Sequence, residues 1–301
     1  MNYTETRKML WTDIEICVIS DDWNTPNVMN WVFQYFRSFE QEFSRFLPHS
    51  NLSMLNEFKK FKVSWRFIDL LNISKDMYAK TDRFFNPLVD LSSIWYSHDF
   101  SSWDFEKLER KSSLDLNEVV IDWNEVKMWE NDFLDFGWIG KWYAAWEAAK
   151  IFKIFWYDNF YINAGGDIYA SWLNEDWQKW VVWIENPFDR SLLWYIKISD
   201  KAVATSWSYI RNWNIWWKNY HHIINPKNAE NESDIVNVTV IADKWYEADA
   251  FTKSIFNMKA TDSIEFMKKN NLAWMIITKE NELVFSYDFE DIYEFTLIKD
   301  S

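Results

Sequence analysis

The chain contains 23 Trp residues but only four Gly residues in 301 positions. Glycine usually makes up about 7% of a globular sequence, which would be about 21 residues in a chain of this length. Glycine is also the residue that adopts positive φ at low cost, because a Cβ atom is strained in that conformation. A fold with ordinary turns must therefore use other residues at its turn positions, and Trp stands at several of them, as in the segment Thr-Ser-Trp-Ser at 205–208.

The bulk composition is that of a folded protein. Hydrophobic residues make up 49% of the chain and charged residues 26%, which is typical of globular proteins and not of disordered ones. The formal net charge of −14 argues against a nucleic acid as partner, because a polyanion would be repelled. No apolar run approaches the roughly 18 residues of a membrane span, and the N-terminus lacks the apolar core of a signal peptide. We therefore expect a cytoplasmic protein with no membrane span.

Hydrophobic periodicity predicts a mixture of helices and strands. Helical spacing of apolar residues predicts helices over 27–46, 64–81, 142–155, 248–258 and 263–269, with a short helix after Ser50. Strand patterns occur at 9–20, 118–122, 126–134, 160–163, 180–185, 194–199, 202–205, 235–242, 273–278, 283–287 and 293–298. Runs of strands separated by helix pairs favour an α+β fold with a mainly antiparallel sheet. No linker rich in Pro, Gly or Ser divides the chain, so we expect a single domain over residues 1–301.

All four Gly residues lie in two short segments. The segment 135–143 reads Asp-Phe-Gly-Trp-Ile-Gly-Lys-Trp-Tyr and places Lys141 at the start of a predicted helix. A helix N-terminus with a nearby cation suits a phosphate, although a simple helix-entry turn with a solvated lysine gives the same pattern. The segment 163–167 reads Asn-Ala-Gly-Gly-Asp after an apolar strand. It fits a tight turn or bulge as well as a loop that faces a ligand.

Two further clusters have side chains suited to catalysis or metal binding. His221 and His222 are adjacent, so on an extended segment at most one of them faces a site, where it could act as a general base. Asp249 and Thr252 are three residues apart and share one face of a predicted helix. A carboxylate and a hydroxyl are oxygen ligands that suit Mg²⁺, but a solvated helix start would look the same.

Taken together and in order, these segments resemble the ApbE family of FAD:protein FMN transferases. The resemblance spans residues 9–258, and each piece is short, but their shared order is specific. The matching pieces are Leu-Trp-Thr at 10–12 for Met-Gly-Thr, the Ser- and Asn-containing segment 44–56, Phe-Phe-Asn-Pro at 84–87, the segment 135–143 for Asp-x-Gly-Gly-Ile-x-Lys-Gly-Tyr, 163–167 for Asn-x-Gly-Gly-Asp, Thr-Ser-Trp at 205–207 for Thr-Ser-Gly, 222–226 for His-Ile-Ile-Asp-Pro, and Ala-Asp-Ala at 248–250, which opens the metal-binding helix.

The departures from the family pattern concentrate on one residue type. Trp stands where the family has Gly at Trp11, Trp138, Trp142 and Trp207, and glycine would fit equally well at Trp95, Trp156, Trp172, Trp177 and Trp183. We hypothesise that the gene uses UGA codons for glycine and that these were translated as Trp; UGG codons at these positions would contradict this. Trp180 and Trp274 lie in apolar strand contexts and are expected to be genuine.

Two other departures concern the chemistry that the resemblance implies. The family often has Thr four residues after the metal-binding Asp, and here that position is Lys253. Phe46 stands where a Tyr often lies against the flavin, so the ring is kept and the hydroxyl is lost.

The resemblance implies Mg²⁺-dependent transfer of FMN from FAD to a Thr or Ser hydroxyl of an acceptor flavoprotein, with release of AMP. It implies His222 as the base and three metal ligands, namely Asp249, Thr252 and the carbonyl of Trp138. The flavin and its phosphates would be held by Leu10, Phe46, Phe84, Phe85, Asn86, Asp135, Lys141 and Ile223. The implied fold is related to the T-fold, with two antiparallel sheet-plus-helix halves and the flavin between them.

Two other functions stay open from the sequence. One is Mg²⁺-dependent hydrolysis of FAD to FMN and AMP, with water in place of the acceptor hydroxyl. The other is a non-catalytic FAD-binding protein, which the presence of Lys253 at the usual Thr position favours.

Overall fold

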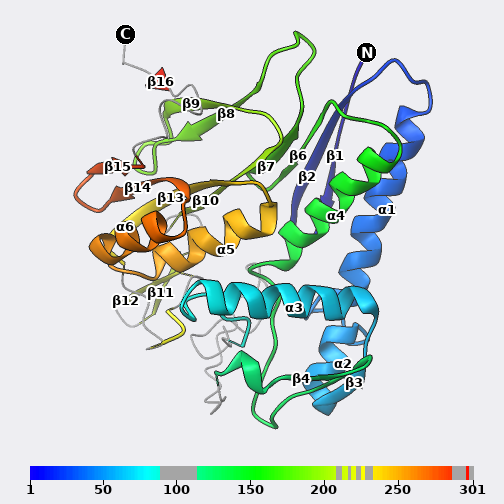
Figure 1. Cartoon of the computed structure of the whole chain (residues 1–301), viewed down its shortest axis with the longest axis vertical. Helices are drawn as coiled ribbons and strands as arrows, with labels where there is room; N and C mark the ends of the chain where they lie inside the picture. The colour runs from blue at the N-terminus through cyan, green and yellow to red at the C-terminus, as the bar shows by residue number, and fades with distance from the viewer. Residues whose placement is uncertain are drawn as a thin grey trace.

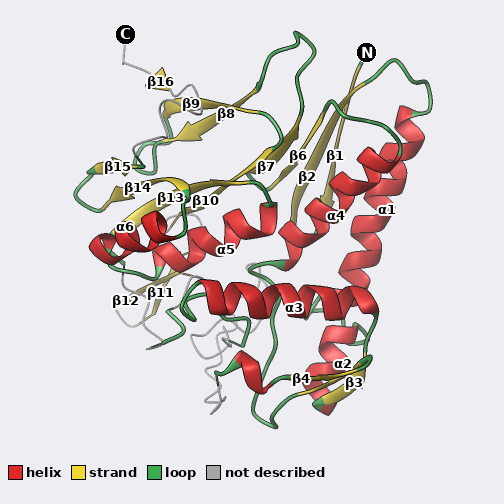
Figure 2. Cartoon of the chain, viewed as in Figure 1, coloured by secondary structure: helices red, strands yellow, loops and turns green. Residues whose placement is uncertain are grey.

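The computed structural model describes residues 1–88, 114–207, 212–215, 218–221, 225–227, 233–286 and 296–297. Its centre is an eight-stranded sheet in the order β1-β2-β6-β7-β10-β13-β14-β15 (Figures 1 and 2), in which every pair of neighbours is antiparallel. The strands are β1 (Asn2–Met9), β2 (Thr12–Ile19), β6 (Phe160–Ala164), β7 (Asp167–Ser171), β10 (Lys201–Trp207), β13 (Ile235–Ala242), β14 (Ala273–Thr278) and β15 (Leu283–Phe285). The predicted α+β class with an antiparallel sheet is confirmed, and the sheet runs without a break from the N-terminal to the C-terminal strands.

The sheet is covered on both faces. One face packs against the helices α1 (Thr25–Phe43), α4 (Gly140–Ile154) and α5 (Trp245–Phe256), with α6 (Ala260–Lys269) beside α5. The opposite face of the main sheet packs against a second, three-stranded sheet, and the two form a second hydrophobic core. The strands of this second sheet are β8 (Trp180–Glu185), β9 (Leu192–Ile198) and β16 (Thr296–Leu297). β14 shows the two-sided burial directly, because Trp274 and Ile276 join the helix-side core while Met275 and Ile277 join the other.

A smaller layer completes the chain below the main sheet (Figure 1). It contains α2 (Asn51–Phe58), α3 (Trp65–Lys80), the short helix η2 (Leu116–Glu118) and a sheet of β3 (Lys60–Lys62), β5 (Glu125–Lys127) and β4 (Val120–Asp122). A separate hairpin pairs β11 (Asn212–Ile215) with β12 (Lys218–His221). The predicted cap at Ser50 is confirmed, since its hydroxyl accepts the Ser53 N–H at 3.0 Å.

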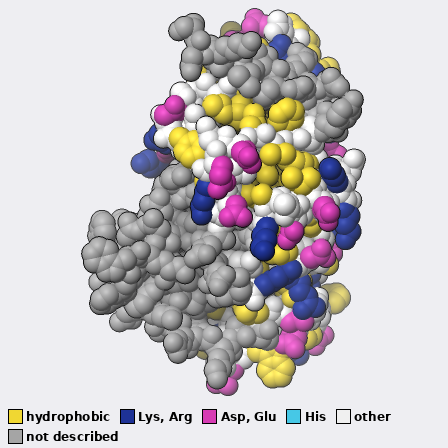
Figure 3. Space-filling model, turned by 90° about the vertical axis from the view of Figure 1, so that its left-hand side faces the viewer, with side chains coloured by type: hydrophobic (Ala, Val, Ile, Leu, Met, Phe, Trp, Pro, Cys, Tyr) yellow, Lys and Arg dark blue, Asp and Glu magenta, His cyan; other side chains and the backbone are white. Residues whose placement is uncertain are grey.

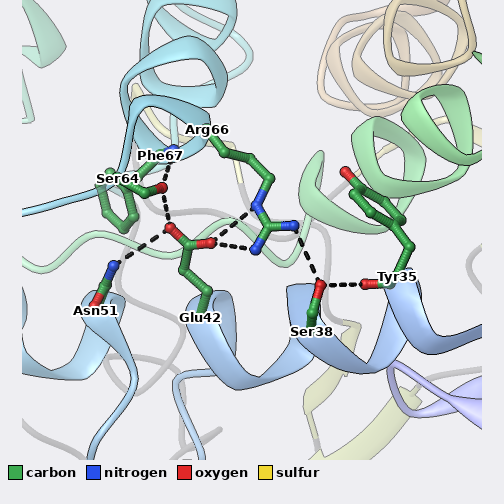
Figure 4. A network of polar contacts seen from close by, with 7 residues as sticks. All are labelled: Tyr35, Ser38, Glu42, Asn51, Ser64, Arg66 and Phe67. Atoms are coloured by element: carbon green, nitrogen blue, oxygen red, sulfur yellow. Dashed lines mark hydrogen bonds and ion pairs between the residues drawn. The ribbon is translucent and has the colours of Figure 1, made fainter.

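One carboxylate ties the first three helices together. Glu42 of α1 accepts two hydrogen bonds from the Arg66 guanidinium of α3, at 2.9 and 2.5 Å, and one from Asn51 at the start of α2 (Figure 4). The Ser64 hydroxyl also donates to Glu42 while it caps α3 by accepting the Phe67 N–H. Both Arg66 bonds end on Glu42 Oε2, while Oε1 accepts from Asn51 and Ser64, so this one charge-assisted carboxylate holds the three helices together.

Two strand predictions were wrong in part. The segment 9–20 contains the turn and the second strand of a hairpin, not a single strand. The first strand of this hairpin, β1, was not predicted, because it forms a sheet edge and its residues are almost all polar. The strand predicted over 126–134 ends at Lys127, and the Asp132 N–H then bonds to the Trp129 carbonyl in a turn. The remaining predicted elements on described residues are present, with ends shifted by a few residues.

Trp is concentrated at left-handed backbone positions. Fourteen described non-glycine residues have positive φ, and five are Trp: Trp11, Trp123, Trp156, Trp172 and Trp177. A share in proportion to its content of 23 in 301 would be about one residue. Four of the five are among the positions where the sequence suggested glycine. Trp183 and Trp207, by contrast, lie within β8 and β10 and have no left-handed backbone, so conformation gives no reason for glycine there.

Two of these sites are turns that normally require glycine. Leu10 and Trp11 form the two-residue loop between β1 and β2, with φ of 50° and 61°, the pattern of a type I′ turn. Trp156 follows the last turn of α4 with φ of 64°, while its N–H bonds to the Lys153 carbonyl and the Tyr157 N–H bonds to the Phe152 carbonyl. This is the Schellman pattern, in which glycine is the usual left-handed residue.

Replacing Trp156 by Gly is therefore expected to stabilise the protein by about 1 kcal/mol, because the left-handed strain is removed and the exposed ring (89% exposed) makes little contact. Urea denaturation at 25 °C measures the change. The matched control is Trp31→Gly in the middle of α1, where the backbone is helical and glycine should destabilise. Equal effects of the two substitutions would contradict the argument.

Candidate active site

Four segments that are distant in sequence meet at one end of the main sheet. The Gly165 N–H bonds to the Asp13 carbonyl at 3.1 Å, which joins the turn between β6 and β7 to the start of β2. A Cβ atom on Gly165 would lie 2.3 Å from the Thr12 hydroxyl oxygen and 3.4 Å from the Lys141 Nζ atom, and its φ is +71°. Gly165 is thus required both by conformation and by space. The Lys141 ammonium and the Thr12 hydroxyl therefore both lie beside Gly165.

Lys141 reaches this place from the N-terminus of α4. The helix begins at Gly140, and its N-cap residue Ile139 provides no side-chain hydrogen bond to the first turn. The helix dipole makes such a helix end favourable for an anion. The Lys141 ammonium lies 3.8 Å from the centre of the Trp142 ring, and Trp142 itself is buried against Trp245.

Asp167 is the first residue of β7 and is buried next to this cation. Its Oδ1 atom accepts the Thr205 N–H at 2.6 Å, which connects the Gly165–Gly166 turn to β10. Burial raises the pKa of Asp167 to about 7; the Lys141 ammonium opposes this shift and the Asp249 carboxylate adds to it.

Asp249 projects from α5 and is almost fully buried, with an exposed fraction of 1%. The ammonium of Lys253, one helical turn later, forms an ion pair with its Oδ1 atom. Its Oδ2 atom is buried and has no hydrogen-bond partner among the described residues. Burial raises the pKa of Asp249, and the Lys253 ammonium opposes the rise.

The two other predicted metal ligands, Thr252 and Trp138, have different surroundings from Asp249. The Thr252 hydroxyl donates to the Asp249 carbonyl at 2.8 Å and lies 2.8 Å from the Ser206 hydroxyl. Trp138 is buried, and its indole N–H has no partner within the described part of the chain. Among the residues that the structure describes, no group of three or more His, Cys, Asp or Glu side chains could hold a metal ion.

A second group of predicted residues gathers beside the β1–β2 turn. The Phe46 ring packs edge-on against Trp11, with ring centres 5.0 Å apart, and lies 4.8 Å from the Arg45 guanidinium. Arg45 forms an ion pair with Asp135 at 2.5 Å, and Asp135 also accepts the Gly137 N–H at 2.8 Å. Leu10 is half-buried in the same turn. The structure therefore brings Leu10, Phe46 and Asp135 together with Arg45, which the sequence analysis did not single out.

The Phe-Phe-Asn segment is divided between core and surface. Phe85 is fully buried in the main core, and the buried Asn86 donates to the Leu114 carbonyl at 2.9 Å, so both side chains hold the local structure. Phe84 is half-buried, with the Lys227 ammonium 3.6 Å from its ring centre. His222 and Ile223 lie outside the described residues, and their roles stay predictions.

Some site residues could not be recognised from the sequence, because their roles depend on tertiary partners. Ser206 and Thr12 belong to matched segments, but nothing in their spacing indicates a contact with Thr252 or Lys141. A usable signal existed for Arg45, because a basic residue directly precedes the predicted flavin-facing ring of Phe46.

A cavity beside Arg45 and one face of the molecule both carry side chains of mixed charge. A cavity of about 490 Å³ adjoins Arg45 and is otherwise lined by Pro48, Ser53, Asn56, Glu57, Lys59, Glu130, Asn131 and Phe133. On the face drawn in Figure 3, the described acidic and basic side chains are interspersed with apolar ones. None of the helices within the described ranges is long and apolar enough to cross a membrane.

Comparison with known proteins identifies the family. The profile of the ApbE family matches residues 10–276, and the chain belongs to this family. The FAD:protein FMN transferase of Escherichia coli K12 is 24% identical over 261 residues, which cover 81% of this chain and 74% of that protein. The one from Salmonella typhimurium LT2 is 28% identical over 153 residues, or 50% of this chain and 44% of that protein.

Solved structures show the same fold. The ApbE protein from Thermotoga maritima superposes with a TM-score of 0.87 at 20% identity, covering 96% of this chain and 98% of that one. The flavin transferase ApbE from Vibrio cholerae gives 0.82 at 18% identity, covering 97% and 99%. These likenesses confirm the predicted ApbE-like α+β architecture.

The raised pKa of Asp167 predicts a specific pH dependence of stability. The folded state holds this proton up to about pH 7, whereas the unfolded carboxyl loses it near pH 4, so ionisation of the unfolded state lowers the stability of the folded protein as the pH rises between these values. Asp167→Asn keeps an acceptor for Thr205 but cannot ionise. In the parent protein, the free energy of unfolding should fall by up to about 1.4 kcal/mol per pH unit between pH 5 and 7 because of this group. We expect Asp167→Asn to lack this decrease.

Urea denaturation across this pH range measures the effect, and Asp262→Asn on the exposed start of α6 is the control. A pH profile for Asp167→Asn that matches the parent protein would show that Asp167 is ionised throughout.

Proposed function

We propose that this site transfers FMN from FAD to a Thr or Ser hydroxyl of an acceptor flavoprotein and releases AMP. The observation that carries the proposal is the junction of Thr12, Gly165 and Lys141 at the N-terminus of α4. A close backbone approach, a helix end and an ammonium in one place are suited to a phosphate group. Membership of the ApbE family and the names of the E. coli and Salmonella relatives support flavin transfer as the reaction.

The reaction exchanges one phosphorus–oxygen bond for another. The acceptor hydroxyl oxygen attacks the phosphorus of the FMN half of FAD, the pyrophosphate bond breaks, and AMP leaves with the bridging oxygen. The hydroxyl proton must pass to a base, for which His222 remains the prediction. Such a transfer depends mainly on positioning and on positive charge near the phosphates. Lys141 supplies one such charge, and its placement beside Gly165 supports binding of the phosphates at this point.

The flavin ring would lie beside the β1–β2 turn. Leu10 and Phe46 offer apolar surface there, and the Arg45–Asp135 pair borders it with polar groups. Phe84 is the member of its segment with an accessible ring, whereas Phe85 and Asn86 support it from within.

The Mg²⁺ implied by the resemblance does not fit the residues present. It would be held by Asp249, Thr252 and the Trp138 carbonyl. In this chain an ammonium already pairs with Asp249, and the Thr252 hydroxyl is engaged by Ser206 and by a main-chain carbonyl. The positive charge that faces the pyrophosphate therefore comes from the lysines of the chain itself.

Removal of the Lys141 charge should weaken FAD binding. We expect Lys141→Met to raise the Kd for FAD by about tenfold or more, because a charge-assisted contact to phosphate contributes about 1.5–3 kcal/mol. Quenching of flavin fluorescence measures the Kd. Lys150→Met on the exposed side of the same helix is the matched control and should leave it unchanged. The same Kd for both variants would show that Lys141 does not face the phosphates.

Incubation with FAD and an acceptor domain separates the three candidate activities. Transfer gives a covalently fluorescent acceptor, hydrolysis gives free FMN and AMP without labelling, and a binding protein retains FAD unchanged. The proposed function requires the first result.

Trp138 and Trp142 are expected to obstruct the FAD site, because both are buried, both lie within three residues of Lys141 in the sequence, and the Trp142 ring contacts the Lys141 ammonium. The double variant Trp138→Gly, Trp142→Gly should bind FAD more tightly than the parent chain, even if the cavities lower its stability. Isothermal titration calorimetry measures the affinity. Trp177→Gly in an exposed loop is the control, and equal affinity of the parent and the double variant would refute obstruction.

A further inference from the structure

The site at α5 already contains a cation that belongs to the chain. Lys253 has an exposed fraction of 8% and Asp249 of 1%, so their ion pair is shielded from solvent. They are four residues apart on one helix, which places both side chains on the same face. A buried ammonium is stable only when it is paired, and Asp249 is its partner.

The charges around this pair are balanced without any further ion. Among the described residues around this pair, Asp249 and Asp167 are the buried carboxylates, and each is influenced by the ammonium groups of both Lys141 and Lys253. With both carboxylates ionised, two negative charges face two positive charges, and protonation of Asp167 leaves the positive charge in excess. A divalent cation added to this group would leave an excess of positive charge in a buried place, and it would sit on the same carboxylate as an ammonium.

Among the described residues, few side-chain oxygens at this place remain available to a hard divalent cation. Mg²⁺ requires near-octahedral coordination by oxygen. Of the side-chain oxygens present, Asp249 Oδ1 pairs with Lys253, and the Thr252 hydroxyl is used within the protein. The Asp249 Oδ2 atom alone is buried without a described partner.

We propose that Lys253 takes the place of the divalent cation, so that its ammonium is a built-in positive charge on Asp249 and the site works without a bound metal. The catalytic part of this statement rests on the proposed function. In that reaction the Lys253 ammonium would offset negative charge on the pyrophosphate as the bond to AMP breaks, and it neither gains nor loses a proton. A monovalent cation offers less charge than Mg²⁺, so Lys141 provides the second positive charge.

Metal binding tests the proposal independently of catalysis. Mn²⁺ is the probe, and electron paramagnetic resonance reports the fraction bound. The parent protein should show no saturable Mn²⁺ binding at millimolar concentration. Lys253→Thr removes the ammonium and adds a hydroxyl one turn after Asp249, so it should bind Mn²⁺ at least about tenfold more tightly than the parent. Lys268→Thr on the exposed face of α6 is the matched control and should behave as the parent does.

Activity supplies the second measurement. Transfer by the parent protein should continue in EDTA, whereas Lys253→Met, which keeps the bulk but loses the charge, should be slow with or without Mg²⁺. Transfer by Lys253→Thr should become dependent on Mg²⁺. Saturable Mn²⁺ binding by the parent, no gain of binding in Lys253→Thr, or full activity of Lys253→Met in EDTA would each overturn the proposal. If the parent protein transfers no flavin under any condition, the proposed function fails, and the Mn²⁺ titration still decides which cation Asp249 holds.

Discussion

The antiparallel pairing of β2 with β6 is the contact on which the site depends. Ile14 lies opposite Ala164 and Val18 lies opposite Phe160, so the N-terminal hairpin is held in register against a strand almost 150 residues later. A slip of one residue would turn the buried Ile14, Ile16 and Val18 toward the other face, which makes this register strongly specified. The same register places Thr12 against Gly165. Because α4 leads into β6, it also brings Lys141 to that point.

Around this junction the protein concentrates buried charge. Asp167 and Asp249 come from a strand and a helix, and each would be costly alone in the interior. Lys141 and Lys253 offset that cost, and the Thr205 N–H satisfies one oxygen of Asp167. The result is a preorganised polar group at the edge of a tightly packed core. Such a preorganised group can bind a charged substrate without rearrangement of its own side chains.

The sequence was sufficient for the fold class and for most helices and strands, because their apolar periodicity and caps are local. The Gly-Gly turn, Lys141 and Asp249 were identified by short motifs, and they do converge. The role of Lys253 as a counter-ion could not be predicted, because a lysine four residues after an acid is more often a solvated surface pair. Phe85 was expected to contact the flavin. Its complete burial shows that it belongs to the core, and the sequence alone does not reveal this burial. β1 was missed since an edge strand with one polar face lacks the apolar alternation used to recognise strands.

The left-handed Trp residues also bear on how the protein should be produced. Trp11, Trp123, Trp156 and Trp177 are exposed at the tips of turns or after a helix, so each presents a large aromatic surface to solvent. Protruding apolar rings of this kind promote self-association. If the natural organism reads these codons as glycine, expression in a host that reads UGA as Trp would yield a protein more prone to self-association than the natural one. A host that reads UGA as stop would yield only fragments. A recoded gene with glycine at the left-handed positions is then the appropriate starting material for purification.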